Sequence, residues 1–195
     1  SPTLKQDPSN IPPLTRIAEL HFRRLEYEKA IAAVETALAI NTYDPAANFL
    51  YGTILRSRGK LDKAAEAFSV AVRSLEFRSA AYAQLAGISL QQGAFEEAIE
   101  QSDRSLQYNA YNFAAMQNKI SAHRKRNETE AALKACKQLL EMDPLSHYAR
   151  FETYLVGQKQ PDLQTFRKAI TNEFPHETYM ELAMDYVRNG LKDEA

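Results

Sequence analysis

The chain has 195 residues, of which 45% are hydrophobic and 25% are charged, the proportions of an ordinary globular protein. Its 24 basic and 25 acidic residues give a net charge of −1, so no overall field attracts it to nucleic acid or to an anionic membrane, and we expect neither as a partner. A single cysteine, Cys136, excludes an internal disulfide and a cysteine-rich metal site. No apolar run reaches the roughly 18 residues that cross a membrane.

The first thirteen residues differ in composition from the rest of the chain. They hold half of the prolines among small polar residues, with too few apolar side chains to form a core. We predict that residues 1–13 are a flexible linker. From residue 14 onward, apolar residues recur three and four positions apart without the alternation of a strand, which predicts an all-α protein.

Four short segments of similar sequence recur along the chain. Each contains an alanine, and these alanines lie 34 residues apart, at Ala30, Ala64, Ala98 and Ala132. Each segment follows one amphipathic stretch and begins another, so the repeated unit is predicted to be helix, tight turn, helix. Three of the segments are preceded by Gly59, Gly93 or Asn127, residue types that tolerate the left-handed conformation at a helix end.

The period and pattern resemble the tetratricopeptide repeat, in which an aromatic residue, Leu-Gly, Tyr, Ala, Phe and a closing Pro stand at set positions. In the second unit, Tyr51-Gly52, Ala64 and Phe68 occupy the family's positions. The resemblance covers residues 14–195 and implies a right-handed superhelix, an α-solenoid, of antiparallel helix pairs. It implies about five and a half units. These units span residues 14–44, 45–78, 79–112 and 113–146, an irregular unit at 147–175 and a truncated unit at 176–195.

The last two units are expected to depart from the pattern. Residues 157–161 replace the usual turn in the fifth unit, so its second helix should be short, near residues 162–172. The sixth unit stops just inside its second helix, as in a fragment of a longer protein. We expect this end of the array to expose Tyr179, Leu182 and Tyr186. Because an uncapped end exposes apolar surface, we also expect that two chains could dimerise through it.

In tetratricopeptide arrays the first helix of each pair lines a concave groove, and the resemblance places partner-binding residues on the inward faces of those helices. Aromatic and arginine side chains supply most interface energy, so we predict a protein or peptide partner with apolar anchors and a few acidic groups. The residues predicted to bind it are Phe22, Phe49, Arg56, Gln91, Arg124, Tyr148 and Phe151. The alternative is that Phe22 and Phe49 only fill gaps between neighbouring helices.

No catalytic pattern is found in the sequence. Gly52 and Gly59, which precedes Lys60, are separated by six residues, whereas a phosphate-binding loop has four residues between these glycines. The four histidines are scattered along the chain and match no metal-binding motif. Cys136 stands at the repeat's phenylalanine position, which predicts a buried and inert thiol. The basic run at residues 123–126 is expected at the end of a helix, where cations stabilise the negative helix terminus. The alternative is that the run binds an acidic tail or RNA phosphates. We expect no enzyme activity, no cofactor and no metal.

Several segments, including residues 40–45 and 147–152, look like the C-terminal array of large bacterial proteins of Bacteroidetes type. Those proteins carry an uncharacterised β-rich domain upstream that is similar to sugar-processing folds. This resemblance implies an alternative to a scaffold that binds a separate partner. The array would then be an internal structural or oligomerisation arm of a carbohydrate-active protein, and its partner would be the upstream domain of the same chain.

Overall fold

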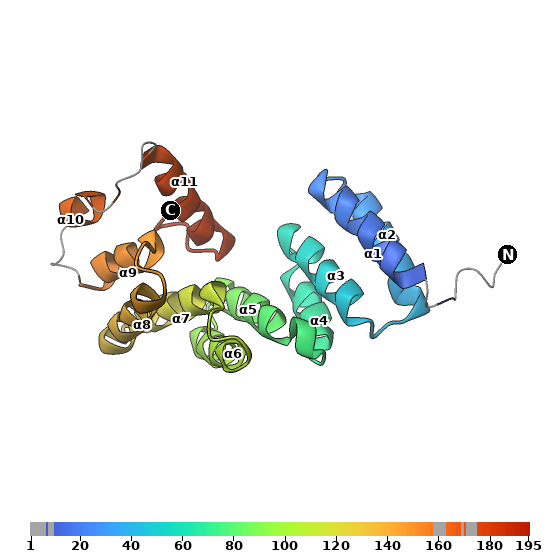
Figure 1. Ribbon diagram of the computed structural model, residues 1–195, viewed down its shortest axis with the longest axis horizontal. Coiled ribbons are helices and arrows are strands. Elements are labelled where there is room, and N and C mark those ends of the chain that lie inside the picture. The colour runs from blue at the N-terminus through green and yellow to red at the C-terminus, as the bar shows by residue number, and fades with distance from the viewer. Residues whose placement is uncertain (1–6, 8–9, 158–162, 169, 171–174) are drawn as a thin grey trace. The chain divides into compact units, whose positions relative to one another are not determined.

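The computed structural model describes residues 7, 10–157, 163–168, 170 and 175–195. All regular secondary structure in these residues is helical, and eleven helices, α1 to α11, follow one another along this part of the chain (Figure 1). The prediction of an all-α fold of helix pairs is confirmed. Most of the predicted N-terminal linker, and residues 158–161 of the irregular turn in the fifth unit, lie outside the described residues.

The helices alternate as first and second members of pairs. The first members are α1 (Ile11–Arg23), α3 (Pro45–Ser57), α5 (Leu75–Gln91), α7 (Phe113–Lys125), α9 (His147–Gly157) and α11 (Pro175–Arg188). The second members are α2 (Tyr27–Ile40), α4 (Leu61–Ala71), α6 (Phe95–Tyr108), α8 (Thr129–Met142) and α10 (Leu163–Lys168). Every second member begins 34 residues after the previous one, so the period seen in the sequence is the period of the helices.

The chain divides into two compact units, residues 1–85 and 86–195. The core of the first unit lies between α1, α2 and α3, and its fully buried members are Ala18, Ala30, Val34, Ala37, Ala47 and Ile54. The second unit has one apolar cluster around α7, α8 and α9, and another that includes residues of α5, α9 and α11. Helix α5 begins in the first unit and ends in the second.

Helix α1 begins at Ile11, so the prediction that the linker extends to residue 13 is wrong at its end. Pro12 and Pro13 lie in the first turn of the helix. The first turn has no intrahelical partner for its N–H groups, so a proline costs nothing there and its fixed φ favours the helix. The proline-rich composition that we interpreted as linker therefore also starts the first helix.

The turns between paired helices have one backbone conformation at one position. Residues 25, 59, 93 and 127 all have positive φ, and they are Leu25 (60°), Gly59 (70°), Gly93 (78°) and Asn127 (60°). In each turn the next backbone N–H donates to the carbonyl five residues earlier, as from Lys60 to Leu55 at 2.9 Å. The predicted left-handed turns at Gly59, Gly93 and Asn127 are confirmed, and the sequence did not predict the one at Leu25.

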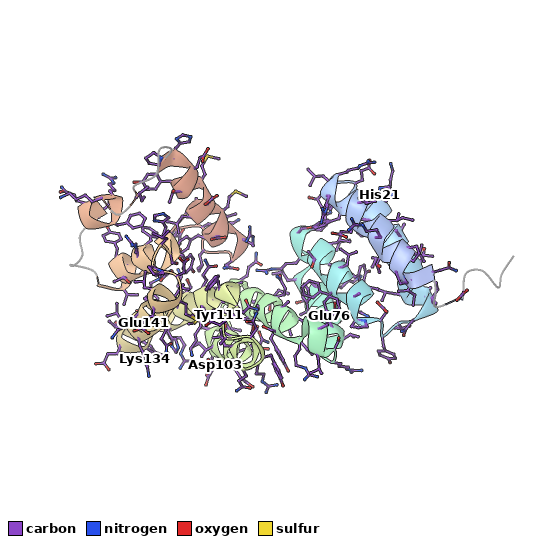
Figure 2. The ribbon with its side chains drawn as sticks, in the orientation of Figure 1. His21, Glu76, Asp103, Tyr111, Lys134 and Glu141 are labelled. Carbon is purple, nitrogen blue, oxygen red and sulfur yellow. The ribbon has the colours of Figure 1, made fainter. Side chains whose placement is uncertain are left out.

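The two turns without glycine share a side-chain contact as well. His21, which lies near the C-terminal end of α1 (Figure 2), places Nδ1 2.5 Å from Oε2 of Glu26. His123 places Nδ1 2.6 Å from Oε2 of Glu128, at the corresponding point of α7. Each hydrogen bond to the histidine is the largest cause that lowers the pKa of its glutamate. These pairs tie the last turn of one helix to the start of the next.

Small residues mark the places where the helices of a pair come close. The four alanines of the repeat, Ala30, Ala64, Ala98 and Ala132, are all fully buried. Gly52 on α3 faces Phe68 on α4, and a Cβ atom on Gly52 would lie 2.9 Å from the Phe68 ring. A larger residue at any of these positions would force the two helices apart.

The fifth pair and the C-terminal end are irregular. Helix α10 has six residues, so the second helix of the fifth pair is short, as predicted; residues 162, 169, 171 and 172 of the predicted range lie outside the described residues. The prediction that the end of the array exposes Leu182 and Tyr186 is wrong, because both are buried. The exposed apolar side chains of α11 are Tyr179, Met180, Met184 and Val187. None of the described helices is long and apolar enough to cross a bilayer.

Candidate functional site

The first unit contains an open cavity of about 550 Å³ lined by residues of α1, α3 and the start of α5. Three phenylalanines, Phe22, Phe49 and Phe77, form its apolar wall. All three are half-buried, so each has one face packed in the unit and one face toward the cavity. Thr15 and Thr53 add hydroxyl groups to the lining, and both bond to backbone carbonyls of their own helices.

Aromatic contacts hold the wall of the cavity in place. The ring of Phe49 lies 5.3 Å from the ring of Phe77 and 5.5 Å from that of Phe68, the second at an edge-to-face angle of 67°. Phe22 contacts Tyr27 with a centroid separation of 6.0 Å. Such pairs contribute about 0.5–1.5 kcal/mol beyond the area they bury. Phe22 and Phe49 therefore both fill space between helices and line the cavity. Filling space between helices does not prevent either side chain from facing a ligand.

The rim of the cavity on α1 carries charge. Glu19 accepts hydrogen bonds from Arg16 at 2.7 Å and from Arg23 at 2.6 Å. These two bonds lower the pKa of Glu19. Two arginines against one glutamate leave one excess positive charge at the rim.

Of the residues predicted to bind a partner, the structure brings Phe22 and Phe49 together at this cavity. Arg56 lies two turns beyond Phe49 along α3 and is not among the residues that line the cavity. Its Nη1 donates a hydrogen bond to Oε1 of Gln84 on α5 at 2.7 Å. Phe77 was not predicted, because it precedes the expected start of the third unit, whereas α5 begins at Leu75.

The four predicted residues of the second unit meet the chain's own C-terminal segment. The Tyr148 ring stacks on Tyr186 of α11 at 5.2 Å, and Phe151 contacts the same ring edge-on at 5.7 Å. Gln91 packs against Gly190, and Arg124 pairs with Glu194. The residues predicted to meet a partner are therefore together on one face, and residues 186–194 cover that face.

A buried ion pair lies at the centre of this face. The Arg124 side chain is 14% exposed and its Nε donates to Oε2 of Glu152, which is fully buried, at 2.7 Å. Glu152 also accepts from Ser121 Oγ at 2.7 Å and from Tyr186 Oη at 2.8 Å, while Arg124 Nη1 lies 2.9 Å from Glu194 Oε1. Burial lowers the pKa of Arg124, but the two glutamates outweigh it and raise the pKa above the ordinary value. A buried carboxylate with this many partners is stable only as long as the arginine stays in place.

Glu152 was not predicted from the sequence, although its spacing from Arg124 is a signal for it. Glu152 follows Arg124 by 28 residues, and Gln84 follows Arg56 by the same number, so an arginine on one first helix meets a polar residue on the next in both cases.

The remaining side chains of the basic run at 123–126 also have acidic partners. Lys125 pairs with Glu194 at 2.5 Å, and Arg126 pairs with Glu96 and Glu128.

Two observations concern metal-ligating side chains and the cysteine in the described part of the chain. No group of three or more His, Cys, Asp or Glu side chains there is arranged to hold a metal ion. Cys136 is 1% exposed, and burial raises the pKa of its thiol to about 12. The predicted burial of Cys136 is confirmed, and a thiol with a pKa raised this far is almost wholly protonated near neutral pH.

Helix pairs that repeat every 34 residues and stack into compact units define an α-solenoid protein. The tetratricopeptide repeat family model matches residues 15–79 of this chain. Residues 15–79 therefore carry tetratricopeptide repeats, and the resemblance to the tetratricopeptide repeat family is confirmed. No curated protein sequence matches the chain.

Solved structures of tetratricopeptide repeat proteins share the fold. YrrB, described as "a TPR protein with an unusual peptide-binding site", is 14% identical with a TM-score of 0.64, over 94% of this chain and 91% of that one. MamA from Desulfovibrio magneticus RS-1 is 15% identical with a TM-score of 0.71, over 90% and 96%. A tetratricopeptide repeat protein from Parabacteroides merdae is 13% identical with a TM-score of 0.71, over 95% and 77%. At these identities the likeness shows the fold.

Proposed function

We propose that this chain is a non-catalytic protein-interaction module whose first unit binds a peptide segment of a partner protein. The observation that carries the proposal is the cavity of about 550 Å³ with its wall of Phe22, Phe49 and Phe77. An open concave site lined by aromatic side chains and a few polar groups is a typical ligand site. The tetratricopeptide repeat is itself an interaction scaffold, and one protein of the same fold is described by its peptide-binding site.

The chemistry of the cavity defines the ligand class. The aromatic wall suits one or two bulky apolar side chains, because burying such a side chain contributes about 1.5–3 kcal/mol. The excess positive charge of Arg16 and Arg23 over Glu19 at the rim favours an acidic residue beside that anchor. Arg56, on the same helix as Phe49, adds a further cation in the same unit. The proposed ligand is a segment with an aromatic or aliphatic anchor and a neighbouring aspartate or glutamate.

The mechanism is presentation by a preformed surface. The ring contacts of Phe49 with Phe68 and Phe77 fix the wall without a ligand, so little conformational entropy is lost when a peptide binds. Affinity then depends on a few anchors in the centre of the site. No step of bond making or breaking is involved.

Selection from a random peptide library displayed on phage tests the proposal. We expect the selected peptides to share a bulky apolar residue flanked by an acidic one. Thr53 lines the cavity without belonging to the core, so Thr53→Glu should weaken binding of these peptides about tenfold through charge repulsion, and Thr53→Lys should keep it. Tyr111→Ala is the control, since Tyr111 is exposed and lies in the other unit (Figure 2).

The alternative function is an internal structural or oligomerisation arm of a larger, carbohydrate-active protein. It predicts that no peptide sequence is enriched and that Thr53→Glu changes nothing. In that case the exposed stripe of Met180, Met184 and Val187 on α11 is the surface to test, because these side chains follow one another at helical spacing. Sedimentation of wild-type chain and of Met184→Glu would then show whether α11 mediates self-association.

A further inference from the structure

The C-terminal residues make contacts that a simple solenoid does not have. In such arrays each helix pair touches only its neighbours along the chain. Gly190 and Glu194, which follow the first helix of the sixth pair, contact Gln91 of α5 and Arg124 of α7, in the third and fourth pairs. Figure 1 shows the C-terminal end of α11 directed toward α7 and the end of α5. The chain therefore folds back over the inward ends of its own first helices.

An apolar anchor holds the first part of this contact. Leu191 is 5% exposed and belongs to the same cluster as Leu90 of α5, Ala98 of α6 and Ala122 of α7. Gly190 precedes it with φ of 73°, and a Cβ atom at this position would lie 2.7 Å from Cγ and 3.4 Å from Cα of Gln91. Only glycine fits both the conformation and the space, so the backbone reaches the surface of α5 directly.

A charged contact holds the second part. The Oε1 atom of Glu194 lies 2.5 Å from Nζ of Lys125 and 2.9 Å from Nη1 of Arg124. The Glu194 side chain is 9% exposed, so solvent screens this pair less than a pair on an open surface. One leucine and one glutamate, three residues apart, thus dock on an apolar patch and a pair of cations.

We propose that the surface formed by Leu90, Gln91, Arg124 and Lys125 is a second peptide-binding site, selective for segments in which an apolar residue is followed three positions later by an acidic one. Residues 190–194 are its resident occupant. The occupant is a loop and a turn, with bonds from Leu191 N–H to Tyr186 and from Glu194 N–H to Leu191, so a partner segment needs no regular helix. A partner binds only the fraction of molecules in which this segment is released, and its apparent affinity falls in proportion.

The test uses the full chain and a fluorescent peptide with the sequence of residues 189–195, Asn-Gly-Leu-Lys-Asp-Glu-Ala, amidated at its C-terminus. In the variant Leu191→Ser/Glu194→Gln the resident segment loses its anchor and its charge. We expect this variant to bind the peptide at least about tenfold more tightly than the wild-type chain does, by fluorescence anisotropy up to about 1 mM. Circular dichroism checks that the variant keeps its helices.

A charge swap identifies the site. Adding Lys125→Glu to the released variant should abolish binding of this peptide and allow binding of a peptide with lysine in place of Glu194. Lys134→Glu is the matched control, because Lys134 projects from the exposed face of α8 (Figure 2). Gly190→Ala gives a second released variant, should the first one fail to fold.

Equal affinity for wild-type and released chains, absence of binding to both released variants, or indifference to Lys125→Glu would overturn the proposal. None of the substituted residues lines the cavity of the first unit. This site can therefore fail its test while the first-unit site passes, and the reverse also holds.

Discussion

Arg124 and Glu152 form a buried ion pair at 2.7 Å, and two repeats earlier Arg56 and Gln84 make the corresponding contact at the same distance. In both cases an arginine near the end of one first helix meets a polar side chain of the next first helix. The contact therefore belongs to the repeat, while the charge on its acceptor differs between the two units. Only the second unit uses a full carboxylate, and there it also meets Tyr186 of α11.

The buried pair predicts different costs for its two partners. Arg124→Leu leaves the Glu152 carboxylate buried without its cation, and loss of one partner of a buried pair costs about 3–5 kcal/mol. Glu152→Gln keeps one acceptor oxygen for Ser121, Tyr186 and Arg124 Nη2 but places an NH2 donor opposite Arg124 Nε. Because Arg124 stays paired with Glu194, we expect a smaller loss of about 1–2 kcal/mol. Urea unfolding followed by circular dichroism measures both. Equal losses for the two variants would show that the charge of Glu152 does not matter.

Gly52 predicts a clash that one other residue should relieve. A Cβ atom there meets the Phe68 ring at 2.9 Å, and Phe68 is fully buried, so Gly52→Ala should cost about 1–3 kcal/mol of unfolding free energy. Combined with Phe68→Leu, the same substitution should cost less than it does alone. Gly157→Ala is the control, because a Cβ atom at that position meets nothing within 4 Å. If the losses of unfolding free energy from Gly52→Ala and Phe68→Leu simply add in the double variant, the cost of Gly52→Ala does not come from a clash with Phe68.

The left-handed turn at Leu25 predicts a stabilising substitution. Leu25 has φ of 60° and a side chain that is largely exposed, and a non-glycine residue in this conformation loses about 1–2 kcal/mol. Leu25→Gly should recover part of that energy, about 0.5–1 kcal/mol after the greater freedom of glycine in the unfolded chain is counted. Gly59→Leu, at the same position one repeat later, should lose stability. A lower melting temperature for Leu25→Gly would contradict this account.

Particular residues show which parts of the structure the sequence could predict. The turns at Gly59, Gly93 and Asn127 and the buried alanines follow from local rules, because residue type and spacing alone determine them. Contacts between pairs that are not adjacent, such as Gly190 with Gln91, depend on where a shortened fifth pair directs α11, and no period encodes that. For the same reason the prediction that Leu182 and Tyr186 are exposed was wrong, since the end of a regular array would expose them.

Cys136 predicts the absence of a reaction in the folded chain. Burial raises the pKa of its thiol to about 12, so almost none of it is thiolate at pH 8. We expect a disulfide reagent such as dithiobisnitrobenzoate to react only when the second unit opens, at a rate that follows unfolding and rises with urea. Rapid reaction of the native chain would show that the cluster of α7, α8 and α9 is open to solvent.

Glu194 predicts that the C-terminal segment is released by acid. Burial raises the pKa of Glu194, but hydrogen bonds from Lys125 and Arg124 outweigh it, so the pKa in the docked chain is below the ordinary value. A carboxyl with a lowered pKa stabilises the docked state above its pKa in the free segment, about 4.3, and this contribution is lost as the pH falls through the lower docked value. Hydrogen exchange at the amides of residues 190–194 should therefore accelerate below about pH 4, after correction for the intrinsic rate. Glu194→Gln should exchange quickly at every pH, and its profile should show no step in this range. A wild-type profile without a step would mean that Leu191 alone holds the segment in place.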